Sequence, residues 1–243
     1  MLIFTVLIII IFSNIYVLQY IKGEELDFFV ESKLFDKTLE EWAKKYWQWW
    51  ATINPDDIPK DPHTNKDSCI LGQDPTGVIF LFNIYGKSYS TQCTINSESF
   101  ILVPLLIGEC DATVETSYAK TGKIEILQKC AILADEIFRA WEVKLDGNIL
   151  FKKSGNEEVN LELKDKILVR NSSPFTLNIP GINYWGVEGG NYTATVDGWY
   201  LILNKLSIGE HILEYTIVHE VLSGTKSKSV FIIGEGAYFF IVK

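Results

Sequence analysis

The chain opens with its longest apolar stretch. Residues 2–12 are apolar except Thr5, and after a short polar break the apolar character continues to Ile21. The first part has the length of a signal-peptide core, and the whole stretch approaches the ~20 residues of a membrane-spanning helix. A buried core helix fits poorly, because soluble helices are rarely apolar on every face. Residues 1–22 are therefore either a cleaved signal peptide or a retained anchor, and the lack of an A-x-A cleavage site favours the anchor.

A helical pattern follows a polar and mixed segment, residues 23–37, that suits a spacer. Thr38 and Glu41 match a capping box, which marks the start of a helix. Apolar residues then recur at helical spacing: Leu39, Trp42, Ala43, Tyr46, Trp49 and Trp50. The pattern predicts an amphipathic helix over 38–51 that packs its aromatic face on the rest of the domain, with Trp47 off that face. A ligand platform or a membrane-lying helix is the alternative.

The period changes to that of strands from residue 77 onward. Gly86-Lys87 separates two candidate strands, 78–85 and 88–94, and predicts a hairpin. Residues 100–106 are continuously apolar and predict a buried strand. Between the strands, helical spacing returns and predicts a second amphipathic helix over 122–137.

The C-terminal half predicts many short strands. Asp146-Gly147-Asn148 is a strong hairpin signal. The other candidate strands lie at 159–163, 166–170, 174–179, 199–203, 210–219, 227–233 and 237–242. This pattern predicts a mainly β protein, with residues 38–243 folded as a single β-sandwich or jelly-roll-like domain.

The four cysteines, Cys69, Cys93, Cys110 and Cys130, form no C-x-x-C pair. In an exported chain such a set indicates two disulfides. Three connectivities are possible, and we prefer Cys69–Cys93 with Cys110–Cys130 because each closes a loop of about twenty residues, worth roughly 3 kcal/mol. Asn171-Ser-Ser and Asn191-Tyr-Thr have the form of glycosylation acceptors, and unmodified asparagines are an equal alternative.

Charge and motifs argue against several functions. The net charge of −9 disfavours nucleic acid as a partner. Asp61, His63, Asn65 and Asp67 alternate like the first ligands of a calcium loop, but Lys66 replaces the turn glycine and Gly72 the final glutamate. A solvated acidic loop is the better interpretation. His63, His211 and His219 share no metal-ligand spacing, and no nucleotide or nucleophile motif occurs. We therefore expect no metal and no cofactor.

Carboxylates beside rigid or aromatic positions are the remaining chemical candidates. Glu109 and Asp111 flank Cys110, whose disulfide would hold their backbone in place. Asp197 precedes Trp199 and Tyr200, whose rings could stack on a sugar. We assign no catalytic residue, because the sequence does not define the carboxylate separation that acid–base catalysis requires. These five residues are binding candidates.

Scattered motifs resemble those of a family of exported bacterial and archaeal proteins of unknown function. They are Trp42-Ala-Lys-Lys-Tyr-Trp-Gln-Trp-Trp50, Asn54-Pro55, Asp67-Ser-Cys69, Gly72-Gln73, Cys93, Val103-Pro-Leu-Leu106, Glu109-Cys110, Cys130, Asp146-Gly147, Phe175-Thr-Leu, Gly186-Val187, Asp197-Gly-Trp-Tyr200 and Leu206-Ser-Ile-Gly-Glu-His211. The resemblance covers most of the chain after residue 38. It implies export and a sandwich-like body, and it implies no activity.

Two functional hypotheses remain. The first is an exported or membrane-anchored, non-catalytic surface module that binds a cell-envelope or membrane partner and attaches to the membrane through residues 2–21. The second is a carbohydrate-active enzyme or carbohydrate-binding protein on a jelly-roll scaffold. A concave cleft with two carboxylates would favour the second hypothesis, and a flat apolar patch would favour the first. We prefer the module.

Overall fold

A computed structural model describes residues 32–57, 71–74, 76–82, 88–113, 115–136, 138–153, 166–222 and 228–243. The predicted N-terminal hydrophobic helix, most of the spacer, the calcium-like loop, Cys69, His63 and the candidate strand 159–163 lie outside these residues. Among the helices it describes, none has both the length and the apolar character needed to cross a bilayer.

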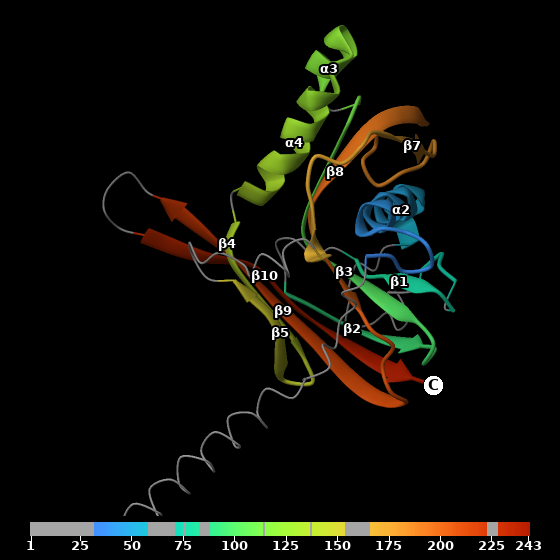
Figure 1. Ribbon diagram of the computed structural model, residues 1–243, viewed down its shortest axis with the longest axis vertical. Coiled ribbons are helices and arrows are strands. Elements are labelled where there is room, and N and C mark those ends of the chain that lie inside the picture. The colour runs from blue at the N-terminus through green and yellow to red at the C-terminus, as the bar shows by residue number, and fades with distance from the viewer. Residues whose placement is uncertain are drawn as a thin grey trace, which may run out of the picture.

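The protein is mainly β, as predicted, and the strands of its described residues form two five-stranded sheets (Figure 1). Sheet I contains β1 (Val78–Phe80), β3 (Phe100–Asp111), β8 (Gly190–Leu203), β6 (Leu168–Val169) and β7 (Phe175–Ile179). Sheet II has the order β2 (Ser88–Ile95), β10 (Lys228–Val242), β9 (Gly209–Leu222), β4 (Phe138–Leu145) and β5 (Asn148–Lys153). The main core lies between them and takes Trp199 from sheet I and Phe151 from sheet II, with ring centroids 6.2 Å apart.

Helix α2 (Leu39–Thr52) covers the other face of sheet I, followed by a short 3-10 turn (Pro55–Asp57). Its capping box is formed, because the Glu41 backbone N–H donates to Thr38 Oγ1 and the Thr38 N–H donates to Glu41 Oε2 at 2.7 Å. The predicted aromatic stripe is buried, with Trp42, Tyr46 and Trp49 packed on β8 and β1. This confirms the docking prediction for the helix.

Trp47, expected off the docked face, still contributes to it. Its ring is partly buried, and Nε1 donates a hydrogen bond to the hydroxyl of Tyr200 at 3.0 Å. Tyr200 is fully buried beneath the helix. Trp47 therefore lies at the border of the aromatic stripe and gives the buried Tyr200 hydroxyl a hydrogen-bond partner.

The hairpin predicted around Gly86-Lys87 is wrong. β1 pairs parallel with β3 in sheet I, and β2 pairs parallel with β10 in sheet II. β1 and β2 therefore belong to different sheets, because each strand pairs with another strand and not with its neighbour in the sequence. The hairpin at Asp146-Gly147 is confirmed, with positive φ angles of 51° and 80° as a tight two-residue turn requires.

Several strands are longer than the sequence predicted. β8 starts at Gly190 rather than near residue 199. The candidate strands 227–233 and 237–242 are one strand, β10, with an irregularity between Ile232 and Gly234. Gly234 and Gly236 inside this strand interrupt its apolar pattern, which is why the sequence predicts two strands. The pairing with β9 nevertheless continues through both glycines.

Helices α3 (Thr116–Thr121) and α4 (Ile124–Glu136) follow β3. Leu127 and Ala131 of α4 are buried beside Cys110. A disulfide joins Cys110 on β3 to Cys130 on α4, which confirms the predicted pair. Cys93 is also disulfide-bonded, but its predicted partner lies outside the described residues, so that pairing stays a prediction.

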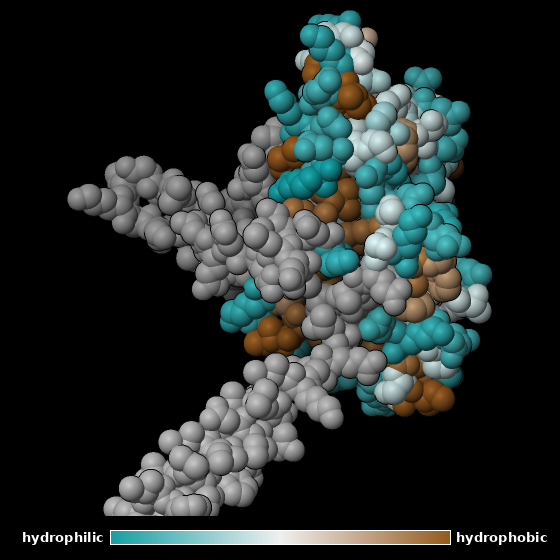
Figure 2. Space-filling view, in the orientation of Figure 1, coloured by the Kyte–Doolittle hydropathy of each residue, from teal (hydrophilic) through white to brown (hydrophobic). Residues whose placement is uncertain are grey.

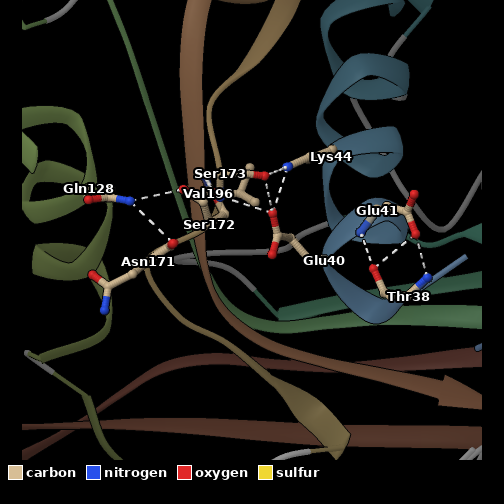
Figure 3. A network of polar contacts seen from close by, with 9 residues as sticks. All are labelled: Thr38, Glu40, Glu41, Lys44, Gln128, Asn171, Ser172, Ser173 and Val196. Carbon is tan, nitrogen blue, oxygen red and sulfur yellow. Dashed lines mark hydrogen bonds and ion pairs between the residues drawn. The ribbon is translucent and has the colours of Figure 1, made fainter. Parts of the chain in front are cut away.

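One short segment, residues 171–173, connects helices α2 and α4 to sheet I (Figure 3). The Val196 N–H of β8 donates to Ser172 Oγ at 2.8 Å, and Gln128 of α4 donates to the Ser172 carbonyl at 3.1 Å. Ser173 donates through its N–H and its hydroxyl to Glu40 of α2. The junction therefore places α2 and α4 relative to the same strand. The first residue of this segment, Asn171, is exposed, as is Asn191, and their glycosylation stays a prediction.

Candidate functional site

Three neighbouring strands of sheet II carry a row of outward-pointing side chains. β2 pairs with β10, which places Gln92 opposite Phe239. β10 pairs with β9, which places Phe239 opposite Ile212. Directly opposed residues point to the same face of a sheet, with Cβ atoms about 5 Å apart. Gln92, Phe239 and Ile212 therefore form one continuous row across the outer face of sheet II.

The apolar members of this row are exposed rather than buried. Along β10, Tyr238 and Phe240 point into the core, whereas Phe239 between them is 39% exposed. Ile212 is exposed to the same extent. Ile149 and Ile208, at the same end of sheet II, are exposed as well. Figure 2 shows hydrophobic surface at the lower end of the molecule, where Figure 1 places β5, β9 and the C-terminus.

This row lines an open groove of about 730 Å³. The groove takes residues from β2, β10, β9 and the β4–β5 turn: Ser90, Thr91, Gln92, Phe239, Phe240, Ile241, Glu210, His211, Ile212 and Asp146. Its surface is mixed, with apolar rings and side chains beside an amide, a hydroxyl and carboxylates. An apolar surface with a few placed polar groups is typical of a ligand site.

Asp146 and His211 form a clasp at the edge of the groove. Asp146 Oδ2 lies 2.7 Å from His211 Nδ1, and Asp146 Oδ1 accepts a hydrogen bond from the Ile212 N–H at 2.8 Å. The Asp146 N–H in turn donates to the Ile212 carbonyl at 2.8 Å. His211 Nε2 lies 2.9 Å from the carbonyl oxygen of Ser207. The clasp therefore joins the β4–β5 turn, the start of β9 and the loop before it.

The clasp favours the protonated imidazole. Burial lowers the pKa of His211, but its hydrogen bonds to Asp146 and to the Ser207 carbonyl, together with the charge of Asp146, outweigh burial and raise the pKa above its usual 6.5. The Asp146 carboxylate can only accept, so Nδ1 donates to it. In the protonated ring Nε2 donates to the Ser207 carbonyl, and in the neutral ring it accepts from Ser207 Oγ at 3.1 Å. Each ring nitrogen of His211 therefore has a hydrogen-bond partner within the protein.

The predicted candidates Glu109 and Asp111 lie on the same face of β3, two residues apart. Asp111 is buried, and its Oδ1 accepts a hydrogen bond from the Thr113 N–H at 2.5 Å. Glu109 Oε1 is buried and has no hydrogen-bond partner in the described part of the chain. Burial and, second, the negative charge of Asp111 raise the pKa of Glu109 well above its usual 4.5. The pair can hold a proton that an exposed glutamate would lose.

Asp197 lies on the opposite face of sheet I from this pair. It is paired with Gly108 in the β3–β8 ladder, and adjacent residues of a strand point to opposite faces, so it points away from Glu109. The Asp197 carboxylate is buried and forms an ion pair with Arg170. The structure thus brings two of the three candidate carboxylates together and assigns the third to a buried ion pair.

The two aromatic candidates belong to the core. Trp199 is 4% exposed and lies between the sheets, and Tyr200 is fully buried under α2. Both positions of β8 face covered surfaces, so neither ring is available to stack on a sugar. The expected aromatic platform beside Asp197 is therefore not present.

The groove itself was missed by the sequence analysis. Its central row depends on the parallel pairing of β2 with β10, strands almost 150 residues apart in the chain. The β10 segment Tyr238-Phe-Phe-Ile241 is continuously apolar, so its pattern does not reveal that one face is open. His211 and the Asp146 turn were both recognised, but their contact required the tertiary structure. In the described residues, no group of three or more His, Cys, Asp or Glu side chains is arranged to hold a metal ion.

No protein-family model matches the chain, and no curated protein matches it. A solved structure described as "Structure of PbICP-C in complex with falcipain-2" aligns with a TM-score of 0.23 and 9% sequence identity, over 69% of this chain and 99% of that chain. At this TM-score the similarity does not establish a shared fold. The resemblance to a family of exported proteins stays a prediction.

Proposed function

We propose that the protein is an exported, non-catalytic binding module that holds a cell-envelope partner on the outer face of sheet II. The observation that carries this proposal is the row of Gln92, Phe239 and Ile212 along an open groove. Exposed apolar side chains gathered on one face are typical of interaction sites. The amide of Gln92 and the carboxylate of Glu210 add hydrogen-bonding groups that would orient a partner.

Two observations support an extracytoplasmic location. The apolar stretch of residues 2–21 has the form of an export signal or an anchor. The Cys110–Cys130 disulfide fits an oxidising compartment, in which such bonds form and persist. Attachment to the membrane through residues 2–21 is part of the same proposal.

The clasp supports binding rather than catalysis at the groove. A general base has to be within reach of a substrate proton and free to accept it. Both ring nitrogens of His211 are instead hydrogen-bonded within the protein, and both oxygens of Asp146 accept hydrogen bonds from β9. These groups shape the groove and do not act on its contents.

Binding to isolated cell envelopes tests the proposal. Phe239→Asp and Ile212→Asp place charges in the apolar row, and we expect each to weaken binding at least tenfold while the melting temperature changes little. Thr176→Asp on β7, an exposed position of sheet I, is the matched control and should bind like the wild type. Unchanged binding of both sheet II variants would reject the groove as the site.

One observation favours the alternative of a carbohydrate-active enzyme. Glu109 has a pKa raised by burial and by the neighbouring carboxylate of Asp111, which meets one requirement of a general acid. If envelope polysaccharide is hydrolysed by the wild type and not by Glu109→Gln, the enzyme replaces the module as the proposed function. Polysaccharide that is bound without hydrolysis, through Phe239, would retain the module.

A further inference from the structure

The connection between β7 and β8, residues 180–189, is closed by internal hydrogen bonds but leaves two large side chains in solvent. Ile182 is 70% exposed and Tyr184 is 52% exposed. Burying such side chains is the usual gain from ordering a segment. Here the segment is ordered and these two are not buried, which is the arrangement expected of a surface prepared for a partner.

Asn183 at the centre of the loop supplies much of its order. The side chain is buried, its Nδ2 donates to the carbonyl oxygens of Pro180 and Val187 at 2.8 Å each, and its Oδ1 accepts from the Val187 N–H. A single amide thus closes the loop on itself. Ile182 and Tyr184, on either side of it in the chain, are exposed as a consequence.

The base of the loop is closed by two glycines. A Cβ atom on Gly189 would lie 2.7 Å from the backbone nitrogen of Gly181, closer than real contacts allow. Trp185 and Val187 then anchor the loop, since they pack on the small core around Leu177. The loop is therefore held by three sets of contacts: the close approach of Gly181 and Gly189, the packing of Trp185 and Val187, and the hydrogen bonds of Asn183.

Helix α2 adds a partly buried ring next to these two exposed side chains. The ring of Trp50 lies 5.6 Å from the ring of Tyr184 in an edge-to-face contact. We define the loop patch as Trp50, Ile182 and Tyr184. It lies on the α2 side of sheet I, the side away from sheet II (Figure 1), so it does not overlap the groove.

The charged residues in the described segments that carry the patch, 48–57 and 180–189, have one sign. Glu188 in the loop and Asp56 and Asp57 just after α2 are exposed, and segments 48–57 and 180–189 contain no Lys or Arg. The last turn of α2 contains no basic residue either, so the negative end of the helix is not neutralised within the helix. An apolar centre with an acidic border complements a partner of the opposite charge.

We propose that the loop patch is a second interaction surface, which binds a protein segment with an apolar or aromatic residue flanked by lysines or arginines. Tyr184 and Trp50 contact the apolar residue, and the acidic border pairs with the flanking charges. An anionic lipid surface is disfavoured, because the same border repels its headgroups. A second copy of this chain is disfavoured by its net charge of −9.

Selection from a random peptide library tests this inference, with the full-length protein as bait. Enriched peptides are then synthesised, and their affinities are measured in solution at low and high salt. We expect peptides with net positive charge and at least one large apolar residue, whose affinity falls with added salt. Enrichment of neutral or acidic peptides would overturn the proposal.

Variants locate the binding on the molecule. Tyr184→Asp and Ile182→Asp should each reduce the affinity for the selected peptides at least tenfold, and Asp57→Lys combined with Glu188→Lys should do the same. Ile212→Asp in the groove is the control and should leave their affinity unchanged. Loss of affinity in Ile212→Asp alone, or no loss in any loop variant, overturns the loop patch and leaves the groove proposal standing.

Vesicles separate a membrane from a protein partner. Vesicles of phosphatidylcholine with one quarter phosphatidylglycerol should bind the wild type and Tyr184→Asp equally. Binding that depends on Tyr184, without Tyr184-dependent peptides, would show that the patch recognises lipid and would overturn the proposal. Ile182 and Tyr184 lie outside the core, so their substitution should leave the melting temperature unchanged. An unchanged melting temperature shows that each variant is folded when its binding is compared with that of the wild type.

Discussion

Sheets I and II each contain five described strands, but they differ in how many faces the described elements cover. In β3 every residue from Ile101 to Gly108 is buried, since sheet II covers one face of sheet I and α2 covers the other. In β10, Tyr238 and Phe240 are buried but Phe239 between them is exposed. Apolar side chains in the central strands of sheet I thus stabilise the fold from both faces, whereas Phe239 and Ile212 on the outer face of sheet II stay partly exposed.

The largest expected effect comes from removing an aromatic ring that covers sheet I. Trp42→Ala leaves a cavity under α2 and should reduce the free energy of unfolding by about 3–5 kcal/mol. Phe239→Ala on the open face of sheet II should cost about 1 kcal/mol or less, as surface substitutions do. Thermal unfolding of the two purified variants measures both. Equal losses would mean that the outer face of sheet II is covered after all.

The next effect concerns a glycine at the centre of sheet I. Gly198 has a φ of 122°, and a Cβ atom there would lie 2.2 Å from the Leu106 carbonyl oxygen. Gly198→Ala therefore adds a backbone clash to backbone strain and should cost about 2–4 kcal/mol. Gly209 at the start of β9 in sheet II has a φ of 143° but open space around it, so Gly209→Ala should cost only about 1–2 kcal/mol.

Chemical denaturation of the two glycine variants gives the comparison directly. A cost for Gly209→Ala as large as that for Gly198→Ala would assign the whole effect to backbone conformation. The close approach of β8 to β3 would then have no measurable share in the stability of sheet I.

A smaller effect, of opposite sign, is expected from the buried carboxyl group of sheet I. The raised pKa of Glu109 means that its stabilising contribution is complete below the unfolded value of 4.5 and is lost as the pH rises through the folded-state pKa. Glu109→Gln keeps the shape without the charge. At pH 7–8 it should raise the melting temperature by roughly 2–4 °C, the change that 1 kcal/mol produces in a domain of this size.

The matched control is Glu210→Gln on sheet II, where the carboxylate is exposed. The melting temperature of Glu210→Gln should equal that of the wild type both near pH 4 and at pH 7–8. Near pH 4 the advantage of Glu109→Gln should disappear as well, because Glu109 is then protonated in both the folded and the unfolded protein. A stabilisation that persists at pH 4 would show that the charge of Glu109 is not its cause.

The smallest effect belongs to the clasp at the edge of sheet II. Because the pKa of His211 is raised, its contribution is complete below 6.5 and is lost as the pH rises through the folded-state pKa. Asp146→Asn removes the charge, tolerates the positive φ of the turn and keeps an oxygen for the Ile212 N–H. Melting temperatures between pH 5 and 9 should show a shallower pH dependence in this variant. An identical pH profile would mean that the clasp does not titrate.

The sequence by itself determined features that depend on neighbouring residues. The capping box at Thr38 and Glu41, the aromatic stripe of α2 and the turn at Asp146-Gly147 each arise from a few consecutive positions. The Cys110–Cys130 pair was also identified, because a loop of about twenty residues is easily closed. These features need no knowledge of which strands become neighbours.

The tertiary structure decided what depends on pairing between distant segments. The predicted hairpin at Gly86-Lys87 is wrong because the partners of β1 and β2 lie in different sheets. Trp199 and Tyr200 were expected to be accessible, but β8 is covered on both faces. Phe239 lies in an apolar run like those of sheet I, and it becomes part of a groove because no helix or sheet among the described residues covers it. Local pattern specifies which residues are apolar, and the packing of the layers determines which of them stay exposed.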